Sequence, residues 1–181
     1  PNMTIVVPSD CTEVGKAVIA LADFEGPAYL RLVGEGFVPI VNEDDYEFEI
    51  GKGIKKREGK DVLIIANGTM VAQSLKVAKE LSEQGIECAV INMHTVKPLD
   101  TKIIDDNIEG KKLVVSIEEG QLNGGLGSAV AEYVSSIDNA PKVLRLGIND
   151  MFLHAGSYQY LLEQCGLTVE QIQDRIKCTI I

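Results

Sequence analysis

Apolar residues along this chain form short β-branched runs that alternate with longer stretches of helical repeat. After residue 60, runs typical of buried strands occupy four places, at 62–66, 88–91, 113–117 and 142–146. Between them, apolar residues recur at the three- and four-residue spacing of an amphipathic helix. Strands separated by helices in this rhythm are typical of a mostly parallel sheet that helices cover on both faces. Because such crossovers are right-handed, residues 61–181 are predicted to form a doubly wound α/β domain.

Polar residues at the expected helix starts support the same division. Thr69 and Asp100 precede helical patterns that follow the first two of these strands, and Ser157 precedes a later one. Each has a side-chain oxygen that can accept a hydrogen bond from a free N–H group of the first helical turn. Thr168 and Gln171 have the spacing of a capping box, which predicts a last helix. The carboxyl end is therefore expected to be helical.

The first 33 residues repeat the pattern on a smaller scale. Residues 4–7 are predicted to be a strand, Asp10 and Glu13 a capping box for a helix, and residues 28–33 a second strand. Strand, helix and strand are too few elements to close a sheet, because they leave strand edges unpaired. We therefore expect this segment to need either a partner chain or further sequence.

Residues 34–60 separate the two patterns, and their charges are grouped by sign. The acidic group is Glu43, Asp44, Asp45, Glu47 and Glu49, and the basic group that follows is Lys52, Lys55, Lys56, Arg57 and Lys60. Groups of opposite sign this close together indicate a solvated linker, or a hairpin with opposite charges across it. A domain boundary is predicted within this range.

Charge and length limit the kind of partner. With 181 residues, 45% of them hydrophobic, the chain can hold one domain with a good core, or one such domain and a fragment of another. A formal net charge of −10 speaks against nucleic acid or an anionic membrane as a partner, since both bind basic patches.

The cysteines indicate a reducing compartment. Cys11, Cys88, Cys165 and Cys178 are scattered, with no C-x-x-C pair and no closely placed histidine, so they predict free thiols rather than disulfides or a zinc site. No apolar run has the length of a bilayer span, and no signal peptide is recognisable. We therefore expect a cytoplasmic chain. Because it begins at Pro1 without an initiator Met, we also expect it to be processed or cut from something longer.

The stretch Glu118–Val130 joins a buried strand to a helix, and Gly124, Gly125 and Gly127 lie at the start of that helix. Free N–H groups at such a helix start could hold a phosphate or carboxylate. Alternatively, the glycines could serve only a sharp turn and close packing of the helix on the sheet. We favour the packing interpretation because Glu118 and Glu119 would repel an anion. The dinucleotide fingerprint also fails, since Val130 occupies the position of its third glycine. On this interpretation, Gly125→Val should reduce folding or dimer stability.

Few residues qualify as chemical groups. His94 follows a strand and His154 lies in a later loop, and neither has a paired Ser, Cys or carboxylate motif, so a structural role is favoured over proton transfer. Ser128 lies in Gly-Leu-Gly-Ser-Ala, which lacks the order of a nucleophile elbow. Arg31, near the end of the second strand, suits either a salt bridge or a bound carboxylate or phosphate. No catalytic, cofactor-binding or metal-binding residue is assigned.

Short motifs along the whole chain resemble, in order and spacing, the C-terminal half of transketolases and 1-deoxyxylulose-5-phosphate synthases. No single motif is as specific as the ordered set, and the closest likeness is to the C-terminal subunit of split, two-subunit transketolases. The motifs are Pro1-Asn2-Met3, Pro8-Ser9-Asp10, Gly26-Pro27-Ala28-Tyr29-Leu30-Arg31, Ile50-Gly51-Lys52-Gly53, Gly68-Thr69-Met70, Val96-Lys97-Pro98-Leu99-Asp100, Ser116-Ile117-Glu118-Glu119, Gly124-Gly125-Leu126-Gly127-Ser128-Ala129-Val130 and Gly166-Leu167.

The resemblance implies an enzyme that uses thiamine diphosphate and magnesium to move a two-carbon ketol unit between sugar phosphates. In that family the N-terminal domain holds the diphosphate and metal, and active sites lie at a dimer interface. Residues 1–33 would be the C-terminal remnant of the pyrimidine-binding domain, residues 34–60 a linker, and residues 61–181 the transketolase C-terminal domain. The activating glutamate, the stacking aromatics and a substrate-binding histidine would precede Pro1.

Among the family's functional positions, the resemblance carries over only Arg31, as a candidate for binding the substrate's phosphate. Some members have a second arginine where this chain has Gly34 and a histidine where it has Gly120, so the sugar specificity stays open. The expected partners are an N-terminal half or subunit and a second copy in a homodimer, and the chain is expected to be inactive alone. Three alternatives remain: a fragment of 1-deoxyxylulose-5-phosphate synthase, a 2-oxo-acid dehydrogenase beta subunit, and a non-catalytic dimerisation or regulatory module.

Overall fold

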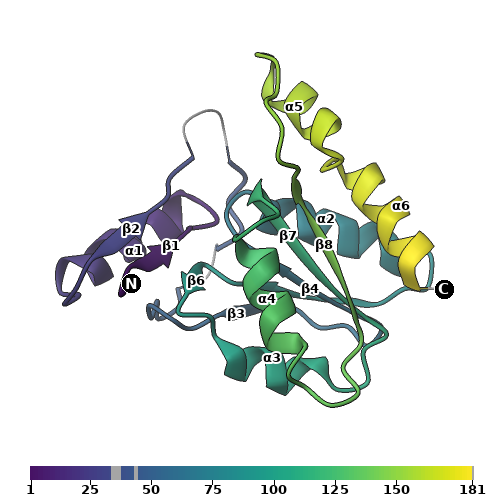
Figure 1. Ribbon diagram of the computed structural model, residues 1–181, viewed down its shortest axis with the longest axis horizontal. Coiled ribbons are helices and arrows are strands. Elements are labelled where there is room, and N and C mark those ends of the chain that lie inside the picture. The colour runs from purple at the N-terminus through teal and green to yellow at the C-terminus, as the bar shows by residue number, and fades with distance from the viewer. Residues whose placement is uncertain (34–37, 43–44, 181) are drawn as a thin grey trace.

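A five-stranded sheet with helices on both faces forms the larger part of the chain (Figure 1). The structure is a computed structural model that describes residues 1–33, 38–42 and 45–180; Gly34, Glu43 and Asp44 lie outside these ranges. The order of strands is β3-β5-β4-β7-β8, of which the last four are parallel and β3 is antiparallel to β5. Their bounds are β3 Ile54–Arg57, β4 Val62–Ala66, β5 Cys88–Asn92, β7 Leu113–Gln121 and β8 Lys142–Ile148. The predicted doubly wound, mostly parallel α/β fold is confirmed.

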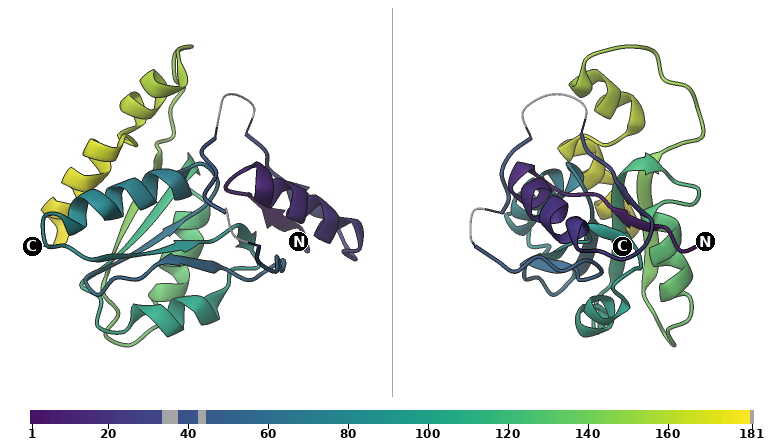
Figure 2. Two further views of the ribbon diagram at one scale, coloured as in Figure 1. Left: turned by 180° about the vertical axis from the view of Figure 1, so that it is seen from behind. Right: turned by 90° about the vertical axis from the view of Figure 1, so that its left-hand side faces the viewer.

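Helices pack on the two faces of this sheet because the strands send alternate side chains to opposite sides. In β4, Val62 and Ile64 join the core under α2 (Met70–Ser82) and α6 (Val169–Ile180). Their neighbours on β4 join the core under α3 and α4 on the other face, as Figure 2 shows from two further sides. The bounds of the remaining helices of this part are α3 Thr101–Ile108, α4 Leu126–Val134 and α5 Tyr158–Cys165. No described helix has the length and apolar character needed to cross a membrane.

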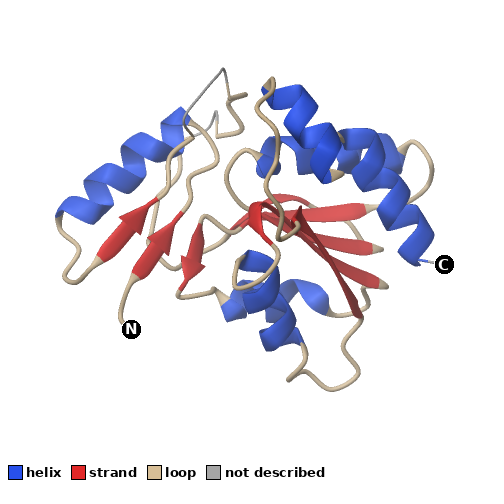
Figure 3. Cartoon of the chain, turned by 45° about the horizontal axis from the view of Figure 1, so that its top comes forward, coloured by secondary structure: helices blue, strands red, loops and turns tan. Residues whose placement is uncertain are grey.

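A second, three-stranded sheet contains the beginning of the chain (Figure 3). Its order is β2 (Ala28–Leu30), β1 (Thr4–Val6) and β6 (Thr95–Lys97), with α1 (Cys11–Ala22) connecting the parallel pair β1 and β2. The second edge of β1 is paired antiparallel with β6, which follows β5 in the chain. One of the strand edges that the sequence predicts to need a partner or further sequence is therefore covered from within the chain.

The edge strand β3 lies in the range whose charges indicated a linker or hairpin. It pairs with β5 from Ile54 to Arg57, with a register shift between Lys55 and Arg57. Arg57 also donates hydrogen bonds to the carbonyl of Ala78 at 2.6 Å and to the carboxylate of Glu87 at 3.2 Å. Part of the charged segment is therefore incorporated into the main sheet rather than left in solvent.

Three of the four caps predicted after residue 60 are present, whereas Thr69 does not cap its helix. The backbone N–H of Ile103 donates to Asp100 at 3.2 Å, that of Tyr160 donates to Ser157 at 3.3 Å, and that of Gln171 donates to Thr168 at 3.3 Å, in each case to the side-chain oxygen. Thr69 is the N-cap residue of α2, but its hydroxyl makes no hydrogen bond to the helix backbone. That hydroxyl is instead engaged in the site described below.

A buried carboxylate joins α1 to the main sheet. Glu13 is fully buried, and its Oε2 accepts hydrogen bonds from the backbone N–H of Ser9 at 2.6 Å and from the Ser9 hydroxyl at 2.8 Å. Its Oε1 accepts from the hydroxyl of Tyr46 at 2.8 Å, and the amide of Asn92 on β5 donates to both oxygens at 2.9 and 3.0 Å. The predicted capping box is thus only half formed, because Glu13 binds Ser9 rather than the N-cap residue. Its carboxylate fixes the first segment against β5.

Asp10 makes a second connection and supports a prediction about acid stability. Its carboxylate caps α1 through the N–H of Glu13 at 2.8 Å and accepts from the N–H groups of Val41 and Asn42 at 2.7 and 2.9 Å. Burial works to raise the pKa of Asp10, but these donors outweigh it and hold the pKa below its ordinary value of 3.8. The ionised Asp10 carboxylate therefore stabilises the folded chain fully at pH values above 3.8, the pKa in the unfolded chain. This stabilisation is lost as the pH falls through the lower pKa of the folded chain.

Asp10→Asn keeps a side-chain acceptor for the cap but has no charge to lose. We expect the variant to be less stable than the parent at neutral pH, and the difference to shrink between pH 5 and pH 2, which are rough bounds for the titration of such a carboxyl. Urea denaturation of both chains at a series of pH values measures the difference in their free energy of unfolding. A stability difference that did not change with pH would contradict a role for the ionised carboxylate.

Candidate functional site

The candidate site forms where β7 departs from regular pairing. Ile117 pairs with Leu146 and Gln121 pairs with Ile148, so three residues of β7 lie opposite the single residue Gly147 of β8. A Cβ atom on Gly147 would lie 2.9 Å from the carbonyl oxygen of Gly120, so the extra backbone occupies the space of a side chain. Irregular pairing of this kind redirects side chains at the ends of strands. We refer to residues 118–120 as the β7 bulge.

The first residue of the β7 bulge, Glu118, fills the N-terminus of α4. Its two carboxylate oxygens accept hydrogen bonds from the backbone N–H groups of Leu126 at 2.8 Å and Gly127 at 2.7 Å. The N–H groups that could have held a phosphate therefore bind the chain's own carboxylate, and a diphosphate does not fit there. Burial raises the pKa of Glu118, against the lowering effect of the two N–H donors and of Arg145 and Arg31.

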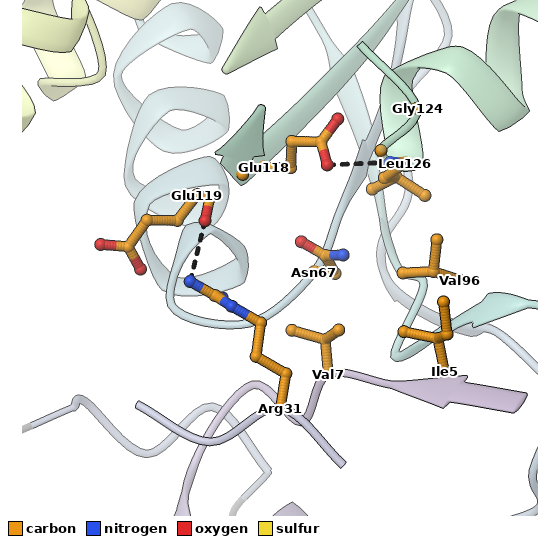
Figure 4. A pocket seen from close by; sticks show the side chains of 11 residues that line it. Ile5, Val7, Arg31, Asn67, Val96, Glu118, Glu119, Gly124 and Leu126 are labelled. Atoms are coloured by element: carbon orange, nitrogen blue, oxygen red, sulfur yellow. Dashed lines mark hydrogen bonds between the residues drawn. The ribbon is translucent and has the colours of Figure 1, made fainter. Parts of the chain in front are cut away.

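The second residue, Glu119, connects three segments that are distant in sequence. Its backbone carbonyl accepts a hydrogen bond from Nη2 of Arg31 at 2.9 Å, and its Oε2 accepts one from the hydroxyl of Thr69 at 2.8 Å. The hydroxyl of Tyr158, the first residue of α5, donates in turn to the Thr69 oxygen at 3.2 Å. Figure 4 shows the side chains of Glu118 and Glu119 pointing in opposite directions, with Arg31 below Glu119.

A pocket of about 150 Å³ lies beside these contacts, at the junction of the two sheets. Arg31 and Glu119 lie at one side of it, Asn67 and Val7 beneath, and Gly124 beyond Glu118 (Figure 4). The pocket is therefore at the carboxyl end of β4 and β7, which is where open α/β sheets usually bind ligands. Arg31 supplies positive charge there, and a guanidinium can bind a carboxylate or phosphate through two parallel hydrogen bonds.

Arg31 is the predicted residue that the structure brings to the pocket, and the two histidines are not among its lining residues. His94 is fully buried, its Nδ1 lies 3.0 Å from the Thr95 hydroxyl, and its ring centroid lies 4.3 Å from that of Phe48. Burial lowers the pKa of His94, although Glu13 acts in the opposite direction. His154 is exposed in the loop before α5.

Ser128 has a structural role and was not expected to be a nucleophile. Its hydroxyl accepts from the N–H of Gly124 at 2.9 Å and donates to the carbonyl of Leu122 at 3.0 Å, which closes the turn before α4.

Thr69 and Tyr158 are site residues that sequence reasoning missed. The signal available for Thr69 was its place beside Gly68 after a buried strand, where a cap was the simpler interpretation.

The fold and this site define the class of protein. Residues 51–172 match the family model of the transketolase C-terminal domain. A solved structure described as "Split gene transketolase, inactive beta4 tetramer" superposes with a TM-score of 0.91 at 38% identity, covering 99% of this chain and 58% of that one. A transketolase from Pichia stipitis, with a TM-score of 0.77, 19% identity and coverage of 99% of this chain and 25% of its own, supports the fold alone.

The chain belongs to the transketolase family. It is 38% identical over 177 residues to a putative transketolase C-terminal section of Methanocaldococcus jannaschii, covering 97% of this chain and 55% of that protein. It is 41% identical to a 1-deoxy-D-xylulose-5-phosphate synthase of Trichormus variabilis, over 97% of this chain and 28% of that protein. The chain thus spans about half the length of the putative C-terminal section and a smaller share of the synthase.

Proposed function

We propose that this chain is the C-terminal part of a thiamine-diphosphate-dependent enzyme that transfers a two-carbon ketol unit between sugar phosphates. Family membership over residues 51–172 supports the reaction class. The observation that carries the proposal for the site is Arg31, whose guanidinium lies at the pocket between the two sheets. When bound, thiamine diphosphate supplies a carbanion equivalent that accepts the ketol unit.

The cofactor and its magnesium belong to the N-terminal half in this proposal. The described helix start that most resembled an anion site, at α4, is filled by Glu118. What this chain contributes is a binding group for the substrate's terminal phosphate. Arg31 donates one hydrogen bond to Glu119 among the described residues, and a guanidinium carries five N–H donors, so several are left for phosphate oxygens.

The proposed assembly is an N-terminal half or subunit together with two copies of this chain, and the chain alone is inactive. Two relatives support a separate subunit that is inactive alone: one is described as a 6-deoxy-6-sulfo-D-fructose transketolase subunit from Clostridium sp. (strain MSTE9), and the solved split-gene transketolase is described as an "inactive beta4 tetramer". All four cysteines are free, which fits the cytoplasm as the proposed location.

A second candidate is the C-terminal part of a 1-deoxyxylulose-5-phosphate synthase, which the 41% identity to such a synthase favours. Both candidates use a phosphorylated sugar and therefore both need a phosphate-binding group. They differ in the ketol or acyl donor, so an assay of the assembled enzyme with each donor in turn separates them. Turnover of sugar-phosphate ketol donors would support the transketolase.

The proposal predicts that Arg31→Met raises the KM for the sugar phosphate by about tenfold to a hundredfold, because a charged hydrogen-bonding group is lost from a phosphate. The measurement uses the enzyme assembled from this chain and its N-terminal half, with thiamine diphosphate and magnesium. Arg175→Met, at an exposed position of α6, is the matched control and should leave KM unchanged.

Two results would contradict the proposal. An unchanged KM for Arg31→Met would remove Arg31 from substrate binding. Ketol transfer by the purified chain without its N-terminal half would refute the claim that it is inactive alone.

A further inference from the structure

We propose that Thr69 and Tyr158 are positioning residues for Arg31, acting through the β7 bulge. The inference rests on the proposed function of Arg31 and adds two residues to it. Three contacts carry it: Tyr158 donates to Thr69 at 3.2 Å, Thr69 donates to the Glu119 carboxylate at 2.8 Å, and Arg31 donates to the Glu119 backbone carbonyl at 2.9 Å.

The β7 bulge needs side-chain support because the strand ladder is irregular there. Between the pairs formed by Ile117 and Gln121, its three residues face one residue of β8, so regular ladder hydrogen bonds do not fix the Glu119 peptide. Gly120 follows and adds backbone freedom. The Glu119 carbonyl, which accepts the hydrogen bond from Arg31, is consequently held in place by the side chains of Glu118 and Glu119.

Those side chains are anchored in opposite directions. Glu118 is bound to the start of α4 by two backbone N–H groups, and Glu119 is bound to the start of α2 by Thr69. In Figure 4 the two carboxylates diverge from the β7 bulge, and the Glu119 carbonyl faces Arg31. Without the hydrogen bond from Thr69, the β7 bulge would be fixed only through Glu118 at the start of α4. The Glu119 carbonyl would then lose its fixed orientation.

The position of Thr69 supports a specific role for its hydroxyl. Thr69 occupies the N-cap position of α2, where a hydroxyl normally accepts a hydrogen bond from the helix backbone, and that bond is not formed. A hydroxyl has one proton to donate, and this one donates it to Glu119. Its oxygen is then available to accept from Tyr158, so the direction of donation from Tyr158 through Thr69 to Glu119 is consistent.

The hydrogen bond from Thr69 to Glu119 involves a buried hydroxyl group, which shields it from competing water, whereas Tyr158 is more exposed to solvent. Thr69 is 7% exposed and Tyr158 is 42% exposed. Burial and the neighbouring Glu119 raise the pKa of Tyr158, and its hydrogen bond to Thr69 and the charge of Arg31 act in the opposite direction. We therefore expect Thr69 to contribute more to the orientation of Arg31 than Tyr158 does.

The test compares Thr69→Val, which keeps the shape and removes the hydroxyl, with Thr69→Ser, which keeps the hydroxyl. In the assembled enzyme, Thr69→Val should raise the KM for the sugar phosphate about fivefold, the equivalent of one hydrogen bond, with little change in kcat. Thr69→Ser should restore the parental KM. Tyr158→Phe should raise KM by a smaller factor.

A double-mutant cycle distinguishes positioning from general damage to the fold. If Thr69 acts through Arg31, Thr69→Val should have no further effect on KM in an Arg31→Met enzyme, and neither variant should change KM for the same sugar without its phosphate. Additive effects, or an equal loss with the unphosphorylated sugar, would overturn the inference. If Arg31→Met itself left KM unchanged, the proposed function of Arg31 would fail instead, so the two failures are distinguishable.

Discussion

Replacing Glu13 by alanine is expected to destabilise the chain by on the order of 3 to 5 kcal/mol. The carboxylate is fully buried and accepts hydrogen bonds from Ser9, Tyr46 and Asn92. Its loss would leave those donors without an acceptor in a place that water does not reach, and each buried donor without a partner costs free energy. Urea denaturation of the purified chain measures the change in the free energy of unfolding.

Glu25→Ala serves as the control, since Glu25 is an exposed residue just after α1 and should change stability by less than about 0.5 kcal/mol. Because Asn92 belongs to the main sheet, the Glu13 variant should also expose the first segment to protease before the rest of the chain. A Glu13→Ala chain as stable as the Glu25→Ala chain would show that the buried network does not hold the two sheets together.

The second large effect is expected at Gly125, the N-cap residue of α4. A Cβ atom at this position would lie 2.1 Å from Oε2 of Glu118 and 2.7 Å from the carbonyl oxygen of Gln121. Gly125→Ala should therefore push the Glu118 carboxylate off the start of α4 and cost about 3 kcal/mol, as overpacking does when neighbours cannot move aside. Gly125→Val, which the sequence already predicted to be harmful, should cost more.

Gly15→Ala is the matched control for this substitution. Gly15 lies within α1, and nothing would lie within 4 Å of a Cβ atom there. That replacement should stabilise the chain by about 0.5 to 1 kcal/mol, because alanine favours a helix and restricts the unfolded chain. Thermal melting of both variants and sedimentation of their assemblies test the pair. Equal melting temperatures for the two would contradict the close packing at Gly125.

Strands β4, β5, β7 and β8 of the main sheet could be predicted from the sequence, whereas β3 at its edge and β6 in the smaller sheet could not. β4 and β5 are buried along their whole length, and apart from Asn92 at the end of β5 every position is apolar, so the runs are clear in the sequence. β3 faces solvent on one side and contains Lys55, Lys56 and Arg57, which gave it the composition of a linker. β6 has three residues, too few for any periodic pattern.

Glu118 illustrates how the candidate site was partly predictable. Its charge next to the glycines argued against a bound phosphate, and the structure supplies the reason: its carboxylate takes the N–H groups that an anion would use. The sequence could not show this, because the hydrogen bonds depend on how the β7 bulge turns the side chain toward α4. The diversion of the Thr69 hydroxyl from its cap position to Glu119 depends on the same bulge.

By itself the sequence left Arg31 open between a salt bridge and an anion-binding role, and it determined the mostly parallel α/β class and the glycine-linked joint at α4. These are local properties, set by which side chains must be buried and which backbone positions must be small. The tertiary structure decided what surrounds Arg31, because Glu119 and Thr69 come from strands and helices distant from it in sequence. Such contacts arise only when the two sheets pack together, and no local pattern of residues encodes that arrangement.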